Sequence, residues 1–78
     1  WRWSGWRAAM RVELFWQLLE NATVVRWDGK RKYCLVYLPG LGYRLYRREG
    51  HWVLLLVVGP EARRWAATFG VEVDGAAA

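Results

Sequence analysis

The fold is decided by one stretch near the middle of the chain, YRLYRREGHWVLLLVV at residues 43–58. Residues 43–48 are predicted to form one strand, and residues 51–58 continue as a second, almost wholly apolar strand. A tight turn at Glu49 and Gly50 joins them in a hairpin. Because the second strand is apolar on both sides, we expect it to be central or covered on both faces of the sheet.

The register of this hairpin assigns its side chains to faces. A two-residue turn places Arg44, Tyr46 and Arg48 on one face of the sheet. The alternate residues of the second strand share that face: His51, Val53, Leu55 and Val57. The opposite face carries Tyr43, Leu45, Arg47, Trp52, Leu54, Leu56 and Val58.

A second hairpin is predicted immediately upstream. Residues 24–27 and 30–38 alternate as strands around Asp28 and Gly29, a pair typical of two-residue hairpin turns. The loop at residues 39–42 contains a proline and two glycines and separates this hairpin from the next. The chain therefore contributes four consecutive antiparallel strands.

Before the strands, the sequence predicts a long helix over residues 5–21, with Ser4 as its N-cap. Its main apolar face holds Ala8, Val12, Phe15, Trp16 and Leu19. A second stripe of Met10, Leu14 and Leu18 lies on another side. Either the helix is buried on both sides, or this stripe contacts a second copy or a larger protein.

After the strands, residues 59–61 start a short helix, with proline in the first turn. Its expected buried stripe is Ala62, Trp65, Ala66 and Phe69, with Arg63 and Arg64 facing out. Gly70 is expected to cap the helix in the left-handed conformation, and residues 71–73 to add a short edge strand.

The predicted fold class is therefore α+β. We expect a four-stranded, mainly antiparallel sheet flanked by the long N-terminal helix and the short C-terminal helix. The 78 residues allow one domain, assigned to residues 1–75, with residues 76–78 as a flexible tail or a remnant of cloning.

The positive charge is concentrated in one part of the chain. Residues 23–48 carry seven basic side chains and a single acid, a net +6, whereas the whole chain carries +5. Several tyrosines and a tryptophan are interleaved with these charges. This composition is typical of a surface that binds phosphates, and it predicts nucleic acid, RNA or DNA, as the partner.

The candidate nucleic-acid-binding residues come from both hairpins: Arg26, Lys30, Arg31, Lys32, Tyr33, Arg44, Tyr46 and Arg48. In a two-residue turn, Arg26 lies opposite Arg31, a like-charge pair that an anion would stabilise. Two other interpretations remain open. The arginines can protect an edge strand from aggregation, or they can bind an acidic protein.

Candidate catalytic or metal-binding residues are few. The single cysteine, Cys34, excludes an intrachain disulfide and sits in a strand, where a buried thiol is expected. His51 is the only histidine and is expected to be exposed beside a turn. We therefore predict no cofactor and no metal. A metal-free ribonuclease built from arginine, lysine and tyrosine stays open, because it needs no signature motif.

The N-terminus alternates tryptophan and arginine over residues 1–7. We favour indole rings that cover the sheet, over a membrane-surface or anionic-groove contact. The longest apolar run, residues 52–58, is far shorter than the roughly 20 residues of a membrane span. We expect a cytoplasmic protein.

The leading functional hypothesis is a small, non-enzymatic binding module that contacts nucleic acid through the basic hairpins. The alternatives are a regulatory or inhibitory protein that docks on a larger protein through the Met10, Leu14 and Leu18 stripe, a homodimer formed through the same stripe, and the minimal ribonuclease.

Overall fold

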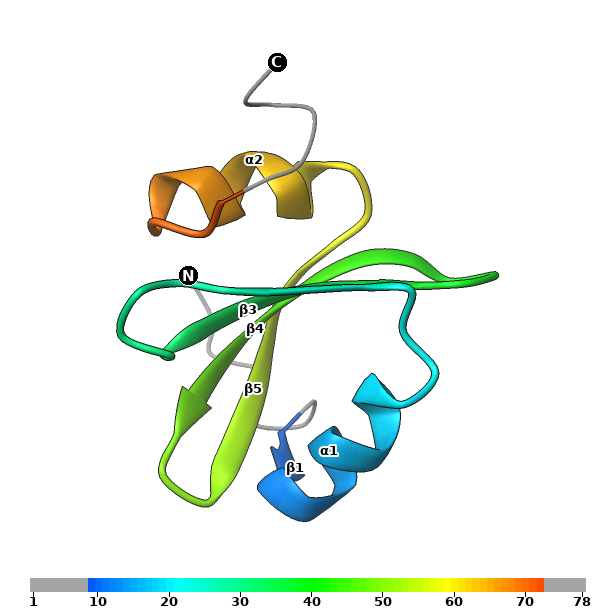
Figure 1. Ribbon diagram of the computed structural model, residues 1–78, viewed down its shortest axis with the longest axis vertical. Helices are drawn as coiled ribbons and strands as arrows, with labels where there is room; N and C mark the ends of the chain where they lie inside the picture. Colours follow the sequence, from blue (N-terminus) through cyan, green and yellow to red (C-terminus); the bar gives the residue numbers. More distant parts are fainter. Residues whose placement is uncertain (1–8, 73–78) are drawn as a thin grey trace.

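The structure is a computed structural model that describes residues 9–72. Within this range the chain forms an antiparallel sheet of five strands: β1 (Met10–Arg11), β2 (Val24–Trp27), β3 (Tyr33–Leu38), β4 (Gly42–Glu49) and β5 (Trp52–Val58). The spatial order is β1-β5-β4-β3-β2. Helices α1 (Val12–Leu19) and α2 (Glu61–Thr68) lie on opposite sides of the sheet (Figure 1). The α+β class is confirmed, and the four predicted strands are present as β2 to β5, but the short strand β1 makes the sheet five-stranded.

The predicted long N-terminal helix is wrong, because the chain enters the sheet before it becomes helical. Met10 and Arg11 pair with Val53 and Trp52 of β5. The backbone N–H of Val12 donates to the carbonyl of His51 at 2.8 Å, and α1 starts there. Pairing with β5 satisfies backbone groups that a longer helix would have satisfied internally. The predicted N-cap Ser4 and the helix residue Ala8 lie outside the described residues.

The β4–β5 turn is displaced by one residue from the prediction. Glu49 pairs with Trp52, so Gly50 and His51 form the turn, and Gly50 has a φ of 59°. Glycine adopts this left-handed conformation without steric cost. The displaced turn pairs Arg48 with Val53, two residues further along β5 than the His51 partner that the predicted turn implies. Because residues two apart in a strand share a face, the predicted faces of β4 and β5 are retained as far as Leu55.

A β-bulge between Leu45 and Tyr46 then changes the faces of the last residues of β5. Leu45 pairs with Val57, while Tyr46 pairs with Leu55. The extra residue moves Val57 to the face of Leu45 and Val58 to the face of Arg44, so both predicted placements are wrong.

The first hairpin has a longer connection than the two-residue turn predicted from the sequence. Trp27 pairs with Cys34 and Arg26 with Leu35, and residues 28–32 form the loop. Arg26 therefore does not lie opposite Arg31, and the predicted like-charge pair is wrong.

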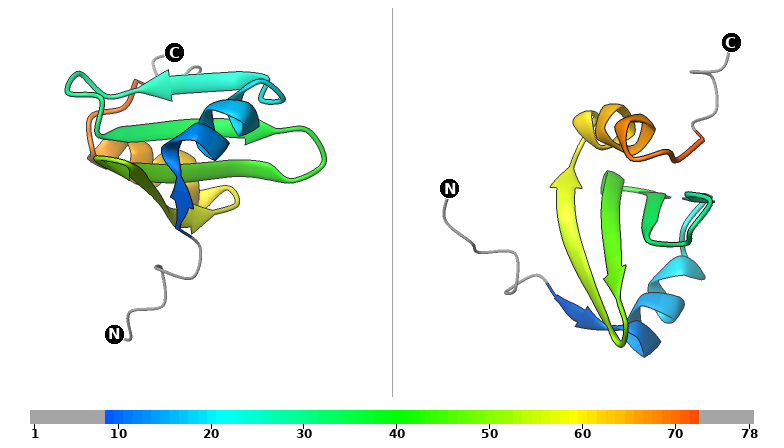
Figure 2. Two further views of the ribbon diagram at one scale, coloured as in Figure 1. Left: turned by 90° about the horizontal axis from the view of Figure 1, so that it is seen from below. Right: turned by 90° about the vertical axis from the view of Figure 1, so that its left-hand side faces the viewer.

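Each face of the sheet has its own core. On the face covered by α1, the buried residues are Val12, Phe15, Cys34, Val36, Leu38, Tyr46 and Val53. On the face covered by α2, they are Leu35, Leu45, Ala62, Ala66 and Val71. In Figure 2 (left), α1 crosses the strands obliquely. The sheet therefore separates two independent surfaces, referred to below as the α1 face and the α2 face.

The end of α2 explains why the predicted edge strand after it is absent from the described residues. Gly70 has a φ of 89°, and the N–H of Val71 donates to the carbonyl of Ala66 at 2.9 Å. This is the hydrogen-bond pattern of a Schellman cap, which confirms the predicted role of Gly70. The cap turns Val71 into the α2-face core, where it is 3% exposed. Residue 73 lies outside the described range.

Candidate nucleic-acid interface

The predicted binding residues are divided between the two faces and the loop. Arg44, Tyr46 and Arg48 lie on the α1 face, because Arg44 and Tyr46 pair with the core residues Val36 and Cys34. Arg26 and Tyr33 belong to the α2 face. The remaining residues of the set, Lys30, Arg31 and Lys32, are exposed in the loop at residues 28–32. The structure therefore does not bring all eight residues into one surface.

Two of the three α1-face residues contribute little to an accessible surface. Tyr46 is 1% exposed and packs edge to face on Phe15, with ring centroids 5.0 Å apart. Arg44 is half-buried, and its guanidinium lies 3.5 Å from the Tyr46 hydroxyl. Tyr46 is thus a core residue, and Arg44 lies near the opposite end of β4 from Arg48.

The loop and the end of β4 are joined directly. The backbone N–H of Arg48 donates to the carbonyl of Lys32 at 2.8 Å. The loop itself is organised by Asp28, whose carboxylate accepts hydrogen bonds from the N–H groups of Lys32 at 2.7 Å and Tyr33 at 2.8 Å. A longer bond of 3.3 Å comes from the N–H of Lys30. This end of the sheet gathers most of the basic stretch.

These hydrogen bonds stabilise the ionised form of the Asp28 carboxyl group. Burial alone would raise the pKa of the carboxyl group, but the backbone N–H donors together hold the pKa below its ordinary value. The side chain is therefore a structural anion inside the basic loop, and it is 9% exposed.

On the α1 face, this end of the sheet carries two tryptophans flanked by two arginines. The Arg48 guanidinium lies 5.5 Å from the Trp16 ring centroid, and that of Arg31 lies 5.8 Å from the Trp27 centroid. The two indole rings are 6.1 Å apart. We call Trp16, Trp27, Arg31 and Arg48 the Trp16 cluster. Trp16 is 42% exposed, so a flat ligand can reach the cluster from solvent.

Both arginines of the Trp16 cluster keep their charge available. Arg48 donates from Nε to the carbonyl of Gly50 at 3.0 Å, which leaves its other nitrogen atoms for a ligand. Within residues 9–72, no carboxylate forms an ion pair with Arg31 or Arg48.

The α2 face carries a second group of aromatic rings at the same end, which we call the Phe69 cluster: Tyr33, Arg47, Trp65 and Phe69. Tyr33 and Phe69 are stacked with centroids 4.3 Å apart and planes 7° apart, and Trp65 stacks on Phe69 at 6.1 Å. Arg47 lies over Tyr33 at 5.8 Å and forms an ion pair with Glu49. An open hollow of about 470 Å³ adjoins this cluster, lined in part by Lys30, Lys32 and Asp28.

The predicted helix stripe does not exist as one face. Met10 is in strand β1 and packs on the α1-face core together with Leu18. Leu14 is 54% exposed. The stripe was predicted by extending the helical period back to Met10, which lies in a strand, whereas Leu14 and Leu18 are in α1. The stripe on α2 is corrected too, since Trp65 is 47% exposed.

Other candidate chemistry is limited. Cys34 is 1% exposed, which confirms the buried thiol, and burial raises its pKa to about 12. The group is therefore protonated at neutral pH and is a poor nucleophile. In the described part of the chain, no three histidine, cysteine or acidic side chains come together as metal ligands. No helix there has the length and apolar character needed to cross a membrane.

Comparison with known proteins gives no further information, because no protein family, curated protein or solved structure matches this chain. The sequence prediction placed Trp16 on the main apolar face of the helix, and it left Trp27 out of the candidate binding residues although Trp27 lies within the basic stretch. A signal was present, since Phe15 and Trp16 are adjacent and cannot both point to the centre of the same helix face.

Proposed function

We propose that this protein is a cytoplasmic module that binds single-stranded nucleic acid through the Trp16 cluster. The observation that carries the proposal is the pair of neighbouring indole rings flanked on each side by an exposed cation, in the order Arg48, Trp16, Trp27 and Arg31. Proteins that bind single strands combine basic side chains, which follow the phosphates, with aromatic rings on which bases stack. The Trp16 cluster supplies both within one corner of the sheet.

A single strand fits this corner better than a duplex does. Trp16 presents a ring to solvent from helix α1, and a base stacks on such a ring only when it is not paired inside a double helix. The two tryptophans are adjacent, so they suit two neighbouring bases. Stacking does not distinguish one base from another, because every base has an aromatic face, so we expect binding with little sequence preference.

The loop and strand β4 connect the two arginines of the Trp16 cluster. The backbone carbonyl of Lys32 accepts a hydrogen bond from the N–H of Arg48, which fixes the loop that carries Arg31 beside the end of β4, whereas the Lys32 side chain lines the hollow beside the Phe69 cluster. The two arginines of the cluster neutralise about two phosphates, which predicts a slope of about −1.4 for the logarithm of affinity against the logarithm of salt concentration.

The first experiment is a titration of a fluorescein-labelled, mixed-sequence single-stranded oligonucleotide, followed by fluorescence anisotropy at several salt concentrations. We expect saturable binding that weakens with salt at about the slope given above, and weaker binding to the same sequence as a duplex. Absence of binding at about 50 mM salt, where phosphate contacts are strong, would refute the proposal. When the oligonucleotide is RNA, electrophoresis of the titrated samples reports any cleavage, and the proposal expects none.

A further inference from the structure

A separate hollow on the α2 face lies away from the Trp16 cluster. It has a volume of about 540 Å³, within the range of small-molecule sites, and adjoins the start of α2 and the β3–β4 turn. The residues that give it chemical character are Tyr37, Leu41, Tyr43, Pro60, Arg63 and Arg64. Neither the proposed nucleic-acid surface nor the α2-face core accounts for this hollow.

One part of the hollow is aromatic and apolar. Tyr37 and Tyr43 pair edge to face, with ring centroids 4.8 Å apart and planes 68° apart. Leu41 is 60% exposed and Pro60 is also exposed. A flat ligand placed against these residues would remove their apolar surface from water, which favours binding.

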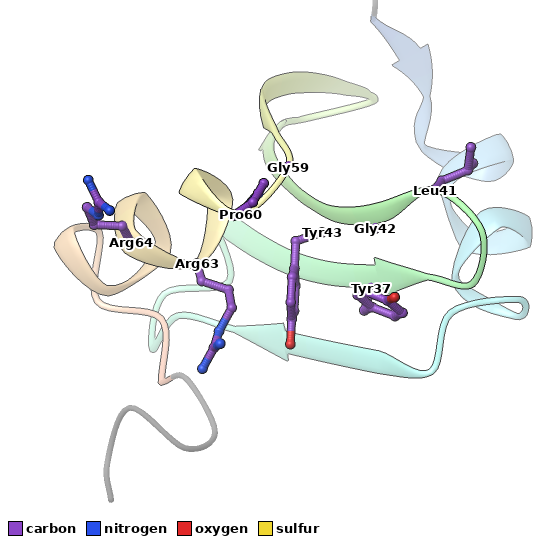
Figure 3. Close-up of a pocket in the computed structure, with 8 residues that line it drawn as sticks. All are labelled: Tyr37, Leu41, Gly42, Tyr43, Gly59, Pro60, Arg63 and Arg64. Atoms are coloured by element: carbon purple, nitrogen blue, oxygen red, sulfur yellow. The ribbon is translucent and has the colours of Figure 1, made fainter.

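The other part is cationic. The Arg63 guanidinium lies 5.3 Å from the Tyr43 ring centroid, and the side chain is half-buried. In Figure 3 the Tyr43 side chain stands between Arg63 and Tyr37, while Arg64 points away from both tyrosines. Among residues 9–72, no acidic side chain lines the hollow. Arginine recognises carboxylate and phosphate groups through its planar array of N–H donors.

We propose that this hollow binds a small aromatic anion, a flat ring joined to a phosphate or carboxylate group. The ring lies against Tyr37, Leu41 and Pro60, and the anionic group meets Arg63. Both parts are required, because the hollow is open and neither surface encloses a ligand alone. The site is independent of the Trp16 cluster, which lies on the other face of the sheet and at the other end of β4.

The test is a titration with adenosine monophosphate, followed by the backbone amide signals in nuclear magnetic resonance spectra of the isotope-labelled protein. Adenosine supplies the ring alone, and ribose 5-phosphate supplies the anion alone. We expect saturable shifts centred on Tyr37, Tyr43 and Arg63 with adenosine monophosphate. Each fragment is expected to bind at least about tenfold more weakly.

The variants Arg63→Gln and Arg64→Gln form a matched pair, since they remove the same charge from adjacent positions of α2. Arg63→Gln is expected to weaken adenosine monophosphate by about tenfold, and Arg64→Gln by less than about twofold. Equal losses, or ribose 5-phosphate binding as tightly as adenosine monophosphate, would overturn the proposal in favour of general charge attraction. Absence of saturable shifts around the hollow of the unaltered protein would also overturn it, whether or not the variants fold.

Discussion

The Trp16 cluster and the Phe69 cluster are built from the same kinds of residue at the same end of the sheet, yet they have different environments. In the Phe69 cluster, Arg47 is paired with Glu49, and the rings of Tyr33 and Phe69 cover each other. In the Trp16 cluster, Arg48 has no carboxylate partner within the described residues, and Trp16 remains partly exposed. Both clusters expose a tryptophan, Trp16 at 42% and Trp65 at 47%. The difference therefore lies in the arginine, which has a carboxylate partner in the Phe69 cluster and none among the described residues in the Trp16 cluster.

The difference has a physical origin in the partners of each group. An ion pair consumes the charge that would otherwise attract a phosphate. The close stacking of Tyr33 and Phe69 also covers one face of each of these two rings, although Trp65 remains partly exposed. Composition alone cannot separate the two cases. Under the proposed function, we therefore expect nucleic-acid binding on the α1 face and mainly a contribution to stability from the α2 face.

The largest expected effect comes from Asp28, which holds the loop between the two clusters. Asp28→Ala leaves the N–H groups of Lys32 and Tyr33 without their acceptor, and we expect a loss of about 3 kcal/mol in the free energy of unfolding. Asp28→Asn is the matched control, because its amide oxygen can still accept both bonds. Urea denaturation checks the difference, and an equal loss in both variants would contradict this role.

Asp28 also makes stability depend on pH. Its pKa is lower in the folded protein than the ordinary value of 3.8, so its contribution to stability is complete above that value. The contribution is lost as the pH falls through the folded-state pKa. Denaturation of the unaltered protein should therefore show a loss of stability in acid that is smaller in Asp28→Asn.

The second-largest effect tests whether the Phe69 cluster contributes to stability without contributing to oligonucleotide binding. Phe69→Ala removes the ring stacked on Tyr33, and because Phe69 is half-buried we expect a loss of about 2 kcal/mol in unfolding free energy. The affinity of the folded variant for the oligonucleotide should stay within about twofold. Thermal denaturation and anisotropy measure the two quantities, and a large affinity loss in the folded variant would contradict the division between faces.

Trp16→Leu is the counterpart on the α1 face. Leucine keeps the apolar and helical character of the position but offers no ring for stacking, so we expect about tenfold weaker binding. The free energy of unfolding should change by less than about 1 kcal/mol, because the indole is partly exposed. Unchanged affinity for the oligonucleotide would remove Trp16 from the interface.

The smallest effect tests whether the ion pair between Arg47 and Glu49 is what distinguishes the Phe69 cluster from the Trp16 cluster. Glu49→Gln frees Arg47 from its carboxylate partner and makes the Phe69 cluster more like the Trp16 cluster. We expect about twofold tighter binding of the oligonucleotide at low salt, with the gain disappearing at high salt. Weaker binding would show that Glu49 supports the interface rather than opposing it.

The sequence predicted the parts of this fold that depend on local pattern. An apolar strand was correctly expected after Gly50, and Gly70 was correctly expected as the cap of the last helix. The expectation that this strand is central or covered on both faces holds only in part, because β1 pairs with Trp52 and Val53 alone, and Trp52, Leu56 and Val58 are exposed. The bulge at Leu45 and the five-residue loop after Trp27 were not predictable from local pattern, because they depend on long-range pairing and on the Asp28 carboxylate. Strand β1 was missed for the same reason, since Met10 and Arg11 are extended only through their contact with β5.

The candidate site was predicted in part. The basic loop is exposed as the charge pattern suggested, and Arg48 lies beside it. Tyr46 was placed on the correct face but at a position that α1 covers, and only the packing of Phe15 reveals this. Trp16 was assigned to the main apolar face of the helix, although it lies at the margin of that face and 42% of its surface is exposed.

The central claim is tested most directly by two adjacent arginines on β4. Arg47→Gln and Arg48→Gln remove the same charge from neighbouring residues whose side chains lie on opposite faces of the sheet. We predict that Arg48→Gln weakens single-strand binding by about tenfold and reduces the steepness of the salt dependence by about 1, whereas Arg47→Gln changes affinity by less than about twofold. Equal losses in the two variants, or a larger loss in Arg47→Gln, would contradict the assignment of binding to the Trp16 cluster.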